Sequence, residues 1–234
     1  MVSSLALAEA REALKHLSFG FASGLVLWFI QERLSSRDLS VSALVNPSAV
    51  SDLASSLDAS SDSAFILDAW ELVGDQISYS GYGSNMVFTD HTVKCQRCSL
   101  PVETLKAREG NCVAKSALLA SLLRTRLPAD RVYMVVGELA ANNIGGHAWV
   151  EAALDSQWYI LEATVPPSDS PWRTAAELEG IYVPKAFLND QALSCYTEGL
   201  CVPISGSRCA CNLIPATPTS MLRMGPIVSG RNPQ

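Results

Sequence analysis

Long apolar runs and clusters of basic residues are both missing from this sequence. The most apolar early stretch, LSFGFASGLVLWFI at 17–30, has 14 residues and contains two glycines. A membrane-spanning helix needs about 20 apolar residues, so we interpret this stretch as part of a buried helix over residues 5–34. We therefore expect no transmembrane helix and a cytoplasmic protein.

The flanks of this stretch keep a secreted or membrane-anchored form open as an alternative. Arg11 and Lys15 precede the apolar residues, and VSA at 41–43 is similar to a weak cleavage site. Glu9 and Glu12 count against a signal peptide, because that region is normally positively charged.

The charge distribution argues against a nucleic-acid partner. The chain has 17 Lys and Arg residues, which are scattered, and a formal net charge of −6. Proteins that bind a phosphate backbone present a basic patch or stripe, and the sequence has none. Hydrophobic residues make up 48% of the 234 residues, which excludes a wholly disordered chain and allows a full core. We find no internal repeat.

Helical and strand patterns follow one another along the chain. Apolar residues recur at helical spacing over 64–79, after a Ser-rich junction at 55–63, and again over 113–126. Asn111 is a suitable N-cap for the second helix, and Pro128 marks its end. β-Branched and aromatic residues then predict strands at 131–139, 147–154 and 157–163. From Pro166 onward only brief helical patterns are present, so we expect a tail that wraps the core. The order of elements predicts an α+β fold.

The last two strands are expected to form a hairpin with Asp155-Ser156 as a two-residue turn. Directly paired residues then have numbers that sum to 311, so that Trp149 faces Glu162 and His147 faces Thr164. Because side chains alternate along a strand, these four residues share one face of the sheet. Glu162 becomes the diagonal neighbour of His147.

Cys112 stands at the start of the 113–126 helix, where a thiol can be a filler, a metal ligand or a nucleophile. Backbone N–H groups at a helix start stabilise a thiolate and can also hold an oxyanion. The sequence contains three histidines. His16 and His91 have the ordinary pattern of surface or core-edge residues, whereas His147 opens a strand after the glycine loop NNIGG. A Cys at a helix start, a His at a strand start and an acid on the next strand form a nucleophile, a base and an orienting group.

At these residues the sequence resembles the transglutaminase-like superfamily, which has a papain-like core. The matching blocks are LPVETLKAREGNCVAKSALLASLLRTRLPADRVYMVVG, GGHAWVEAAL and WYILEAT. The resemblance implies that Cys112 is the nucleophile, His147 the general base and Glu162 the orienting acid. Asn111, Ala114 and Glu162 depart from the aspartates that the family often has at those places.

The same resemblance implies acyl transfer on a peptide or protein amide through a thioester, with no cofactor required for catalysis. Hydrolysis, as in a thiol protease, is the preferred expectation. A protein-glutamine transglutaminase with an amine acceptor and a silent binding module of the same fold are the alternatives. The implied fold is a helix bearing the nucleophile packed on an antiparallel sheet. We expect an N-terminal helical segment at 1–60, a catalytic core at 61–168 and a Cys-rich extension at 169–234.

Six further cysteines lie outside the expected catalytic site. Cys95 and Cys98 form a C-x-x-C pair, and Cys209 and Cys211 are two of four cysteines in the tail. These four can form a structural zinc site, although a spacing of one residue is unusual for zinc. Disulfides and free thiols are the other interpretations.

Overall fold

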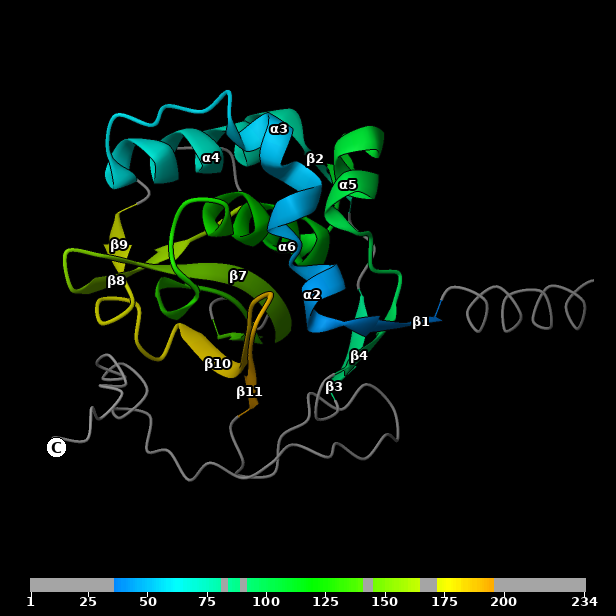
Figure 1. The fold of residues 1–234 in the computed structure, drawn as a ribbon. Coiled ribbons are helices and arrows are strands. Elements are labelled where there is room, and N and C mark those ends of the chain that lie inside the picture. The colour runs from blue at the N-terminus through cyan, green and yellow to red at the C-terminus, as the bar shows by residue number, and fades with distance from the viewer. Residues whose placement is uncertain (1–35, 81–83, 89–91, 141–144, 165–171, 196–234) are drawn as a thin grey trace, which may run out of the picture. The chain divides into compact units, whose positions relative to one another are not determined.

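Helix α6, Cys112–Arg124, packs against strands β6 and β7 of a six-stranded antiparallel sheet (Figure 1). The computed structural model describes residues 36–80, 84–88, 92–140, 145–164 and 172–195. Those from Arg37 onward belong to one compact unit. The α+β class, with this helix on an antiparallel sheet, is confirmed. The helix expected at 5–34 lies outside the described residues.

The six strands follow the order β11-β10-β6-β7-β8-β9 across the sheet. Their bounds are β6 Val132–Leu139, β7 Gly145–Leu154, β8 Gln157–Leu161, β9 Arg173–Thr174, β10 Tyr182–Leu188 and β11 Leu193–Cys195. Side chains alternate between two packed faces. Ala148 and Val150 belong to the main core, while Trp149 between them belongs to a second apolar cluster with Val135 and Ile160.

Helix α6 is buried around its whole circumference, from Val113 to Leu123. The sequence predicted apolar residues on one side only. The difference arises because α6 is covered by helices as well as by the sheet. Its covering elements are α4 Asp62–Gln76, α5 Pro101–Ala107 and the 3-10 helix η1 Pro47–Val50.

Two buried polar side chains on α6, Lys115 and Ser121, bond to backbone groups of neighbouring elements. Lys115 donates from Nζ to the carbonyl oxygens of Ile77 at 2.5 Å and Gly74 at 3.4 Å, at the end of α4. A cation at a helix C-terminus also interacts favourably with the helix dipole. Ser121 accepts a hydrogen bond from the Asn46 backbone N–H at 2.8 Å. These contacts fix how α4 and the segment at Asn46 lie on α6.

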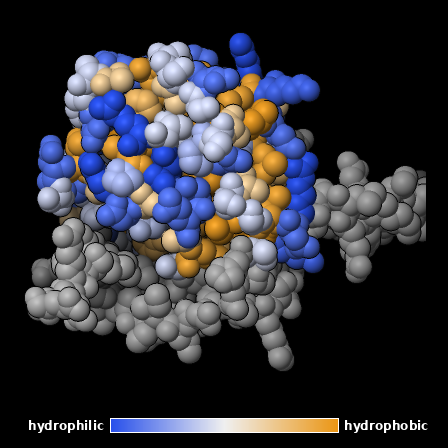
Figure 2. Space-filling model, viewed as in Figure 1, coloured by the Kyte–Doolittle hydropathy of each residue, from blue (hydrophilic) through white to orange (hydrophobic). Residues whose placement is uncertain are grey.

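The remaining elements are short. They are β1 Ser36–Ser40, α2 Val41–Leu44, α3 Ser51–Ala54, β2 Ser78–Tyr79, β3 Asn85–Phe88, β4 Thr92–Gln96, β5 Glu109–Gly110 and the 3-10 helix η2 Ala129–Arg131. A three-stranded sheet has the order β1-β4-β3, and β2 pairs with β5 in parallel. On the face shown in Figure 2, hydrophilic residues cover much of the described surface, with hydrophobic residues between them. None of the described helices is long and apolar enough to cross a membrane.

The hairpin predicted from the sequence is confirmed. Strands β7 and β8 pair with Val150 opposite Leu161 and Leu154 opposite Gln157, so every pair sums to 311. Asp155 and Ser156 have φ angles of 49° and 67°, the left-handed values that a two-residue turn of this kind requires.

The expectation of a tail with brief helical patterns is wrong between Arg173 and Cys195, where the chain forms β9, β10 and β11. Strand β10 lies beside β6 within the sheet. Pro184 conceals this strand in the sequence, because a proline cannot donate to a strand ladder and normally argues against an interior strand. The structure accommodates it with a shift in register between Pro184 and Ala186, which is how a β-bulge tolerates an unpaired residue.

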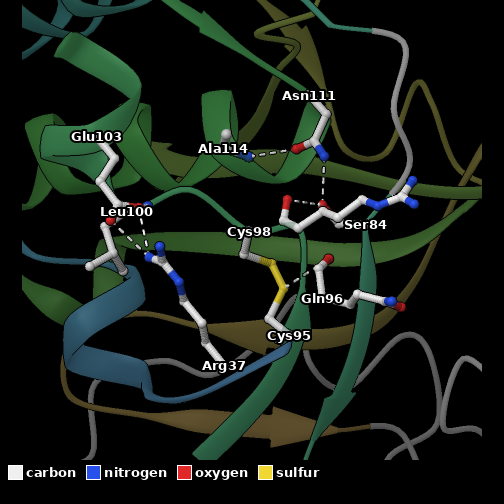
Figure 3. Close-up of a disulfide and its surroundings, with 10 residues drawn as sticks. Arg37, Ser84, Cys95, Gln96, Cys98, Leu100, Glu103, Asn111 and Ala114 are labelled. Atoms are coloured by element: carbon white, nitrogen blue, oxygen red, sulfur yellow. Dashed lines mark hydrogen bonds and ion pairs between the residues drawn. A yellow bond between two sulfur atoms is a disulfide. The ribbon is translucent and has the colours of Figure 1, made fainter. Parts of the chain in front are cut away.

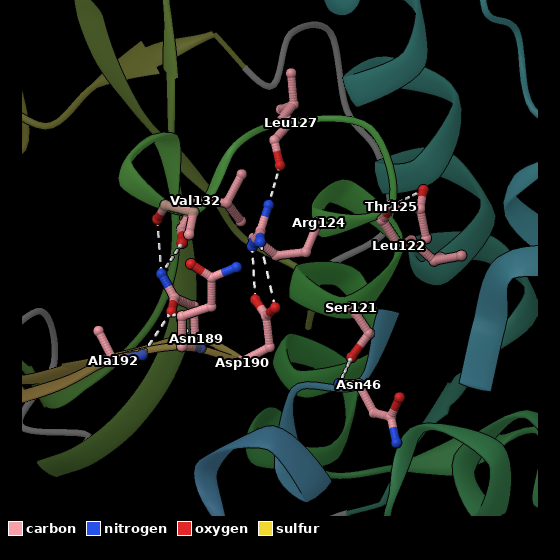
Figure 4. A network of polar contacts seen from close by, with 12 residues as sticks. Asn46, Ser121, Leu122, Arg124, Thr125, Leu127, Val132, Asn189, Asp190 and Ala192 are labelled. Atoms are coloured by element: carbon pink, nitrogen blue, oxygen red, sulfur yellow. Dashed lines mark hydrogen bonds and ion pairs between the residues drawn. The ribbon is translucent and has the colours of Figure 1, made fainter. Parts of the chain in front are cut away.

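The β10–β11 hairpin is attached to the end of α6 by polar contacts (Figure 4). Arg124 at the end of α6 forms an ion pair with Asp190, with 2.6 Å between Nε and Oδ1. Asn189 donates from Nδ2 to the carbonyl oxygens of Ala129 and Val132 at 2.6 and 3.1 Å. The two strands that follow the helix and the late strand β10 are therefore held as one unit.

Gly137→Ala is expected to destabilise the protein strongly. A Cβ at Gly137 would lie 2.2 Å from the carbonyl oxygen of Val183 and 2.9 Å from Cα of Pro184, and backbone atoms in a sheet cannot move aside cheaply. We expect a loss of about 2–4 kcal/mol in urea unfolding. Gly180→Ala is the control, because its Cβ would meet nothing within 4 Å and only its positive φ costs energy, about 1 kcal/mol. Equal losses in the two variants would contradict the packing at Gly137.

Candidate active site

Cys112 is a free, partly exposed thiol at the first position of α6. Asn111 ends the preceding extended segment and caps the helix, since its Oδ1 accepts a hydrogen bond from the Ala114 N–H at 3.1 Å. Its Nδ2 donates to Ser84 Oγ at 2.5 Å (Figure 3). The capping residue is thus held from both ends of its amide, which fixes the start of the helix and the position of Cys112.

Gly110 permits the tight approach of this segment to α5 and α6. A Cβ at Gly110 would lie 2.8 Å from the Ala114 side chain and 3.2 Å from that of Thr104. In the G-N-C motif, the glycine is therefore required for packing, the asparagine caps the helix, and the cysteine places a free thiol at the helix start.

His147 projects from β7, where it pairs with Gly137 of β6. Only 8% of its side chain is exposed. Its Nε2 lies 2.7 Å from Glu162 Oε2, and the Cys112 side chain also interacts with its ring and raises its pKa. Because Nε2 faces Glu162, the nitrogen left for Cys112 is Nδ1.

Glu162 follows the end of β8 and is the most heavily hydrogen-bonded group of the site. Its Oε1 accepts from the Thr164 backbone N–H at 2.9 Å and from Thr164 Oγ1 at 2.6 Å. Its Oε2 accepts from Tyr182 Oη at 3.1 Å in addition to its contact with His147. Its main-chain carbonyl accepts from Trp70 Nε1 of α4 at 2.8 Å. Both the carboxylate and the backbone of Glu162 are therefore fixed in place.

The electrostatics favour a charged His147–Glu162 pair. Burial by itself lowers the pKa of His147, but its hydrogen bonds with Cys112 and Glu162 and the negative charge of Glu162 outweigh burial and raise that pKa to about 9. Burial raises the pKa of Glu162, whereas the hydrogen bond and charge of His147 and the Thr164 donors lower it below its ordinary value. At neutral pH the imidazolium and carboxylate forms therefore predominate.

The structure brings together the three residues that the sequence selected for catalysis, Cys112, His147 and Glu162. His16 and His91, the two histidines set aside, lie outside the described residues. Cys95 and Cys98, both buried, form a disulfide with Cα atoms 5.8 Å apart (Figure 3). The sequence left this interpretation open.

The zinc site predicted from Cys95, Cys98, Cys209 and Cys211 stays a prediction, because the last two lie outside the described residues. In their disulfide form Cys95 and Cys98 do not supply the thiolates that zinc binds. Within the described part of the chain, no cluster of three or more His, Cys, Asp or Glu side chains is placed to bind a metal ion.

Sequence reasoning missed several residues that contact the site. Thr164 ends the resembling block WYILEAT and Trp70 lies in the helical pattern at 64–79, so these two patterns could have drawn attention to them. Tyr182 has no such signal, since it lies on the strand that Pro184 concealed. Tyr79 of β2 interacts electrostatically with Cys112 and Glu162 and is 52% exposed.

Glu151 is a second buried carboxyl on the same strand as His147. Burial raises its pKa to about 7, although a hydrogen bond from Trp149 Nε1 at 3.0 Å acts in the opposite direction. The Trp149 ring lies near the His147 ring, with centroids 6.2 Å apart. Through this hydrogen bond Glu151 holds the Trp149 indole next to His147.

A family model described as a transglutaminase-like domain matches residues 48–175, more than half of the chain. The chain belongs to the transglutaminase-like family. The match begins upstream of the core predicted at 61–168 and ends before β10; the domain bounds from the sequence stay a prediction. No curated protein matches the chain significantly.

Solved structures with similarity to this transglutaminase-like chain include Legionella pneumophila LapG. Its EGTA-treated form is 15% identical with a TM-score of 0.47, over 64% of this chain and 75% of LapG. A second LapG structure is 17% identical with a TM-score of 0.43, over 62% and 75%. A candidate cysteine protease from Cytophaga hutchinsonii is 17% identical with a TM-score of 0.39, over 61% of this chain and 47% of that protein.

Glu162→Gln is expected to cost more stability at pH 6 than at pH 10. The pKa of His147 is about 9 in the folded protein, against about 6.5 in the unfolded chain. The stabilisation that this difference gives is fully present below pH 6.5 and is lost as the pH rises through 9. Removing the negative charge of Glu162 should therefore lower the free energy of unfolding by about 1–3 kcal/mol more at pH 6 than at pH 10. Urea unfolding at both pH values measures this.

The control for this prediction is Glu103→Gln, which removes an exposed carboxylate paired with Arg37. Arginine does not titrate in this range, so the small cost of the control should be the same at both pH values. An equal cost of Glu162→Gln at pH 6 and pH 10 would contradict the charge pairing described here.

Proposed function

We propose that the protein is a cysteine-dependent peptidase or amidase that acts on a peptide or protein substrate through a thioester. The observation that carries the proposal is the arrangement around one imidazole ring. Glu162 holds Nε2 at 2.7 Å, and the Cys112 side chain interacts with the same ring and raises its pKa. This arrangement supports the roles of nucleophile, base and orienting acid that we assign to the three residues.

The first step starts from a Cys112 thiolate beside the His147 imidazolium, with the proton of the thiol on Nδ1 of His147. Glu162 stabilises the imidazolium and keeps the ring oriented. The thiolate attacks the carbonyl carbon of the substrate amide, and its π electrons move to the oxygen. We expect backbone N–H groups at the start of α6 to stabilise the oxyanion.

In the second step, the tetrahedral intermediate collapses. The C–N bond breaks as His147 returns its proton to the leaving amine, and a thioester to Cys112 remains. Neutral His147 then takes a proton from water, the resulting hydroxide attacks the thioester, and the acid product leaves as Cys112 is regenerated. His147 mediates every proton transfer in this sequence, while Glu162 keeps it oriented.

Cleavage and amine incorporation distinguish the proposal from its main alternative. Wild-type protein is incubated with peptide mixtures and, separately, with a glutamine-containing protein and a labelled primary amine. We expect peptide cleavage, and we expect Cys112→Ser and Glu162→Gln to lower turnover by orders of magnitude, about 10⁴-fold where the triad acts as a unit.

Glu103→Gln serves as the control in these assays and should cleave as the wild type does. Amine incorporation without cleavage would favour a transglutaminase and contradict hydrolysis. Absence of both reactions, together with an unreactive Cys112 thiol, would favour a binding module that has kept the fold.

A further inference from the structure

Tyr182 joins the candidate site from a strand that lies beyond the family match. It is the first residue of β10, and the match ends at residue 175. Its hydroxyl donates to Glu162 Oε2 at 3.1 Å, and that same oxygen lies 2.7 Å from His147 Nε2. Two donors from different strands therefore compete for one oxygen of the carboxylate.

We propose that Tyr182 is a positioning residue of this site. By donating a hydrogen bond to Glu162 Oε2, it lowers the affinity of His147 for its proton. The proposal rests on the proposed function of Cys112, His147 and Glu162. A hydrogen bond to a carboxylate draws negative charge toward the donor. The Tyr182 hydroxyl thus leaves less charge for the imidazolium and keeps His147 a stronger acid toward the leaving amine.

The other contacts of Glu162 show why Tyr182 acts on charge more than on orientation. Thr164 anchors Oε1 with two hydrogen bonds of 2.9 and 2.6 Å, and Trp70 anchors the main-chain carbonyl. With these contacts in place, removing the Tyr182 hydroxyl leaves the carboxylate where it is. What changes is the number of donors on Oε2, from two to one.

The phenol is held in place by its own neighbours. The Tyr182 ring packs edge-on against Trp149, with centroids 5.1 Å apart and an interplanar angle of 72°, and Trp149 is anchored to Glu151. Tyr182 pairs with Leu139 across β6 and β10. Burial, with the charge of Glu162, raises the pKa of Tyr182 well above its ordinary value. The hydroxyl therefore stays a donor across the working pH range.

Several other titratable groups interact with this pair, and a test must keep them constant. Glu151 lies on the same strand as His147, and Lys115 and Tyr79 interact electrostatically with Glu162. Cys112 interacts with the His147 ring. A single change at position 182 leaves all four in place, so a difference between the two proteins reports on the hydroxyl.

The test is the imidazole titration of His147 in wild-type protein and in Tyr182→Phe, followed by NMR on histidine-labelled protein. The chain has three histidines, and a His147→Gln variant assigns the signal. We expect a wild-type midpoint well above 6.5 and a rise of about one pH unit in Tyr182→Phe, because the charge on Oε2 concentrates on His147. Tyr133→Phe is the matched control, since Tyr133 packs in the same apolar cluster but interacts with Asp130 and Arg124.

The outcomes separate the two proposals. A wild-type midpoint near 6.5 would overturn the proposed function, because His147 would then lack its charged partner. A raised wild-type midpoint that stays the same or falls in Tyr182→Phe would overturn the role of Tyr182 alone. A shift of the same size in Tyr133→Phe would also overturn it, since loss of packing would be the cause.

Incorporation of 3-fluorotyrosine at position 182 provides a second test if Tyr182→Phe does not fold. The fluorinated phenol has nearly the same shape but is a stronger hydrogen-bond donor. It should therefore draw more charge from Oε2 and lower the midpoint of His147. An unchanged or higher midpoint would overturn the proposal.

Discussion

The carboxylate of Glu162 is a largely buried negative charge, with 15% of the side chain exposed, and the arrangement of the site follows from the need to compensate it. An isolated buried carboxylate is strongly destabilising, so it must be paired and hydrogen-bonded. Here the partners come from separate parts of the chain. His147 of β7 supplies a positive charge, Thr164 and Tyr182 supply donors, and Trp70 of α4 binds the main-chain carbonyl.

This compensation links the sheet to the helices. The hairpin β7–β8 sets His147 and Glu162 on neighbouring strands, and β10 adds Tyr182 from the other side of β6. The helix that begins at Cys112 packs on β6 and β7 and is covered by α4. A change that moves any of these elements also moves a donor of Glu162. Gly137 pairs with His147, so the close packing at Gly137 matters for the site as well as for the fold.

The sequence predicted those features that depend on local patterns. The turn at Asp155-Ser156 predicted the hairpin register. Asn111 as the N-cap and Pro128 after the last turn predicted where α6 begins and ends. Because register decides which side chains share a face, the contact between His147 and Glu162 could be anticipated without coordinates. The resemblance supplied the assignment of roles.

Features that depend on distant segments could not be read in this way. A proline within β10 looks like a strand breaker, and only the adjacent strand β6 shows that a bulge accommodates it. The Tyr182 contact was hidden for the same reason. Lys115 has the pattern of a helix surface residue, yet it is buried because α4 ends directly above it and offers two carbonyl oxygens. Such pairings are decided by tertiary packing, which overrides local propensity.

The central claim is that His147 assists Cys112 as a nucleophile, and the rate at which iodoacetamide alkylates this thiol tests it most directly. Mapping the modified peptides by mass spectrometry separates Cys112 from the other cysteines, in wild-type protein and in His147→Gln. The account predicts that Cys112 is alkylated much faster in the wild type at neutral pH, because His147 holds the proton of the thiol. Equal alkylation rates of Cys112 in the two proteins would contradict the account.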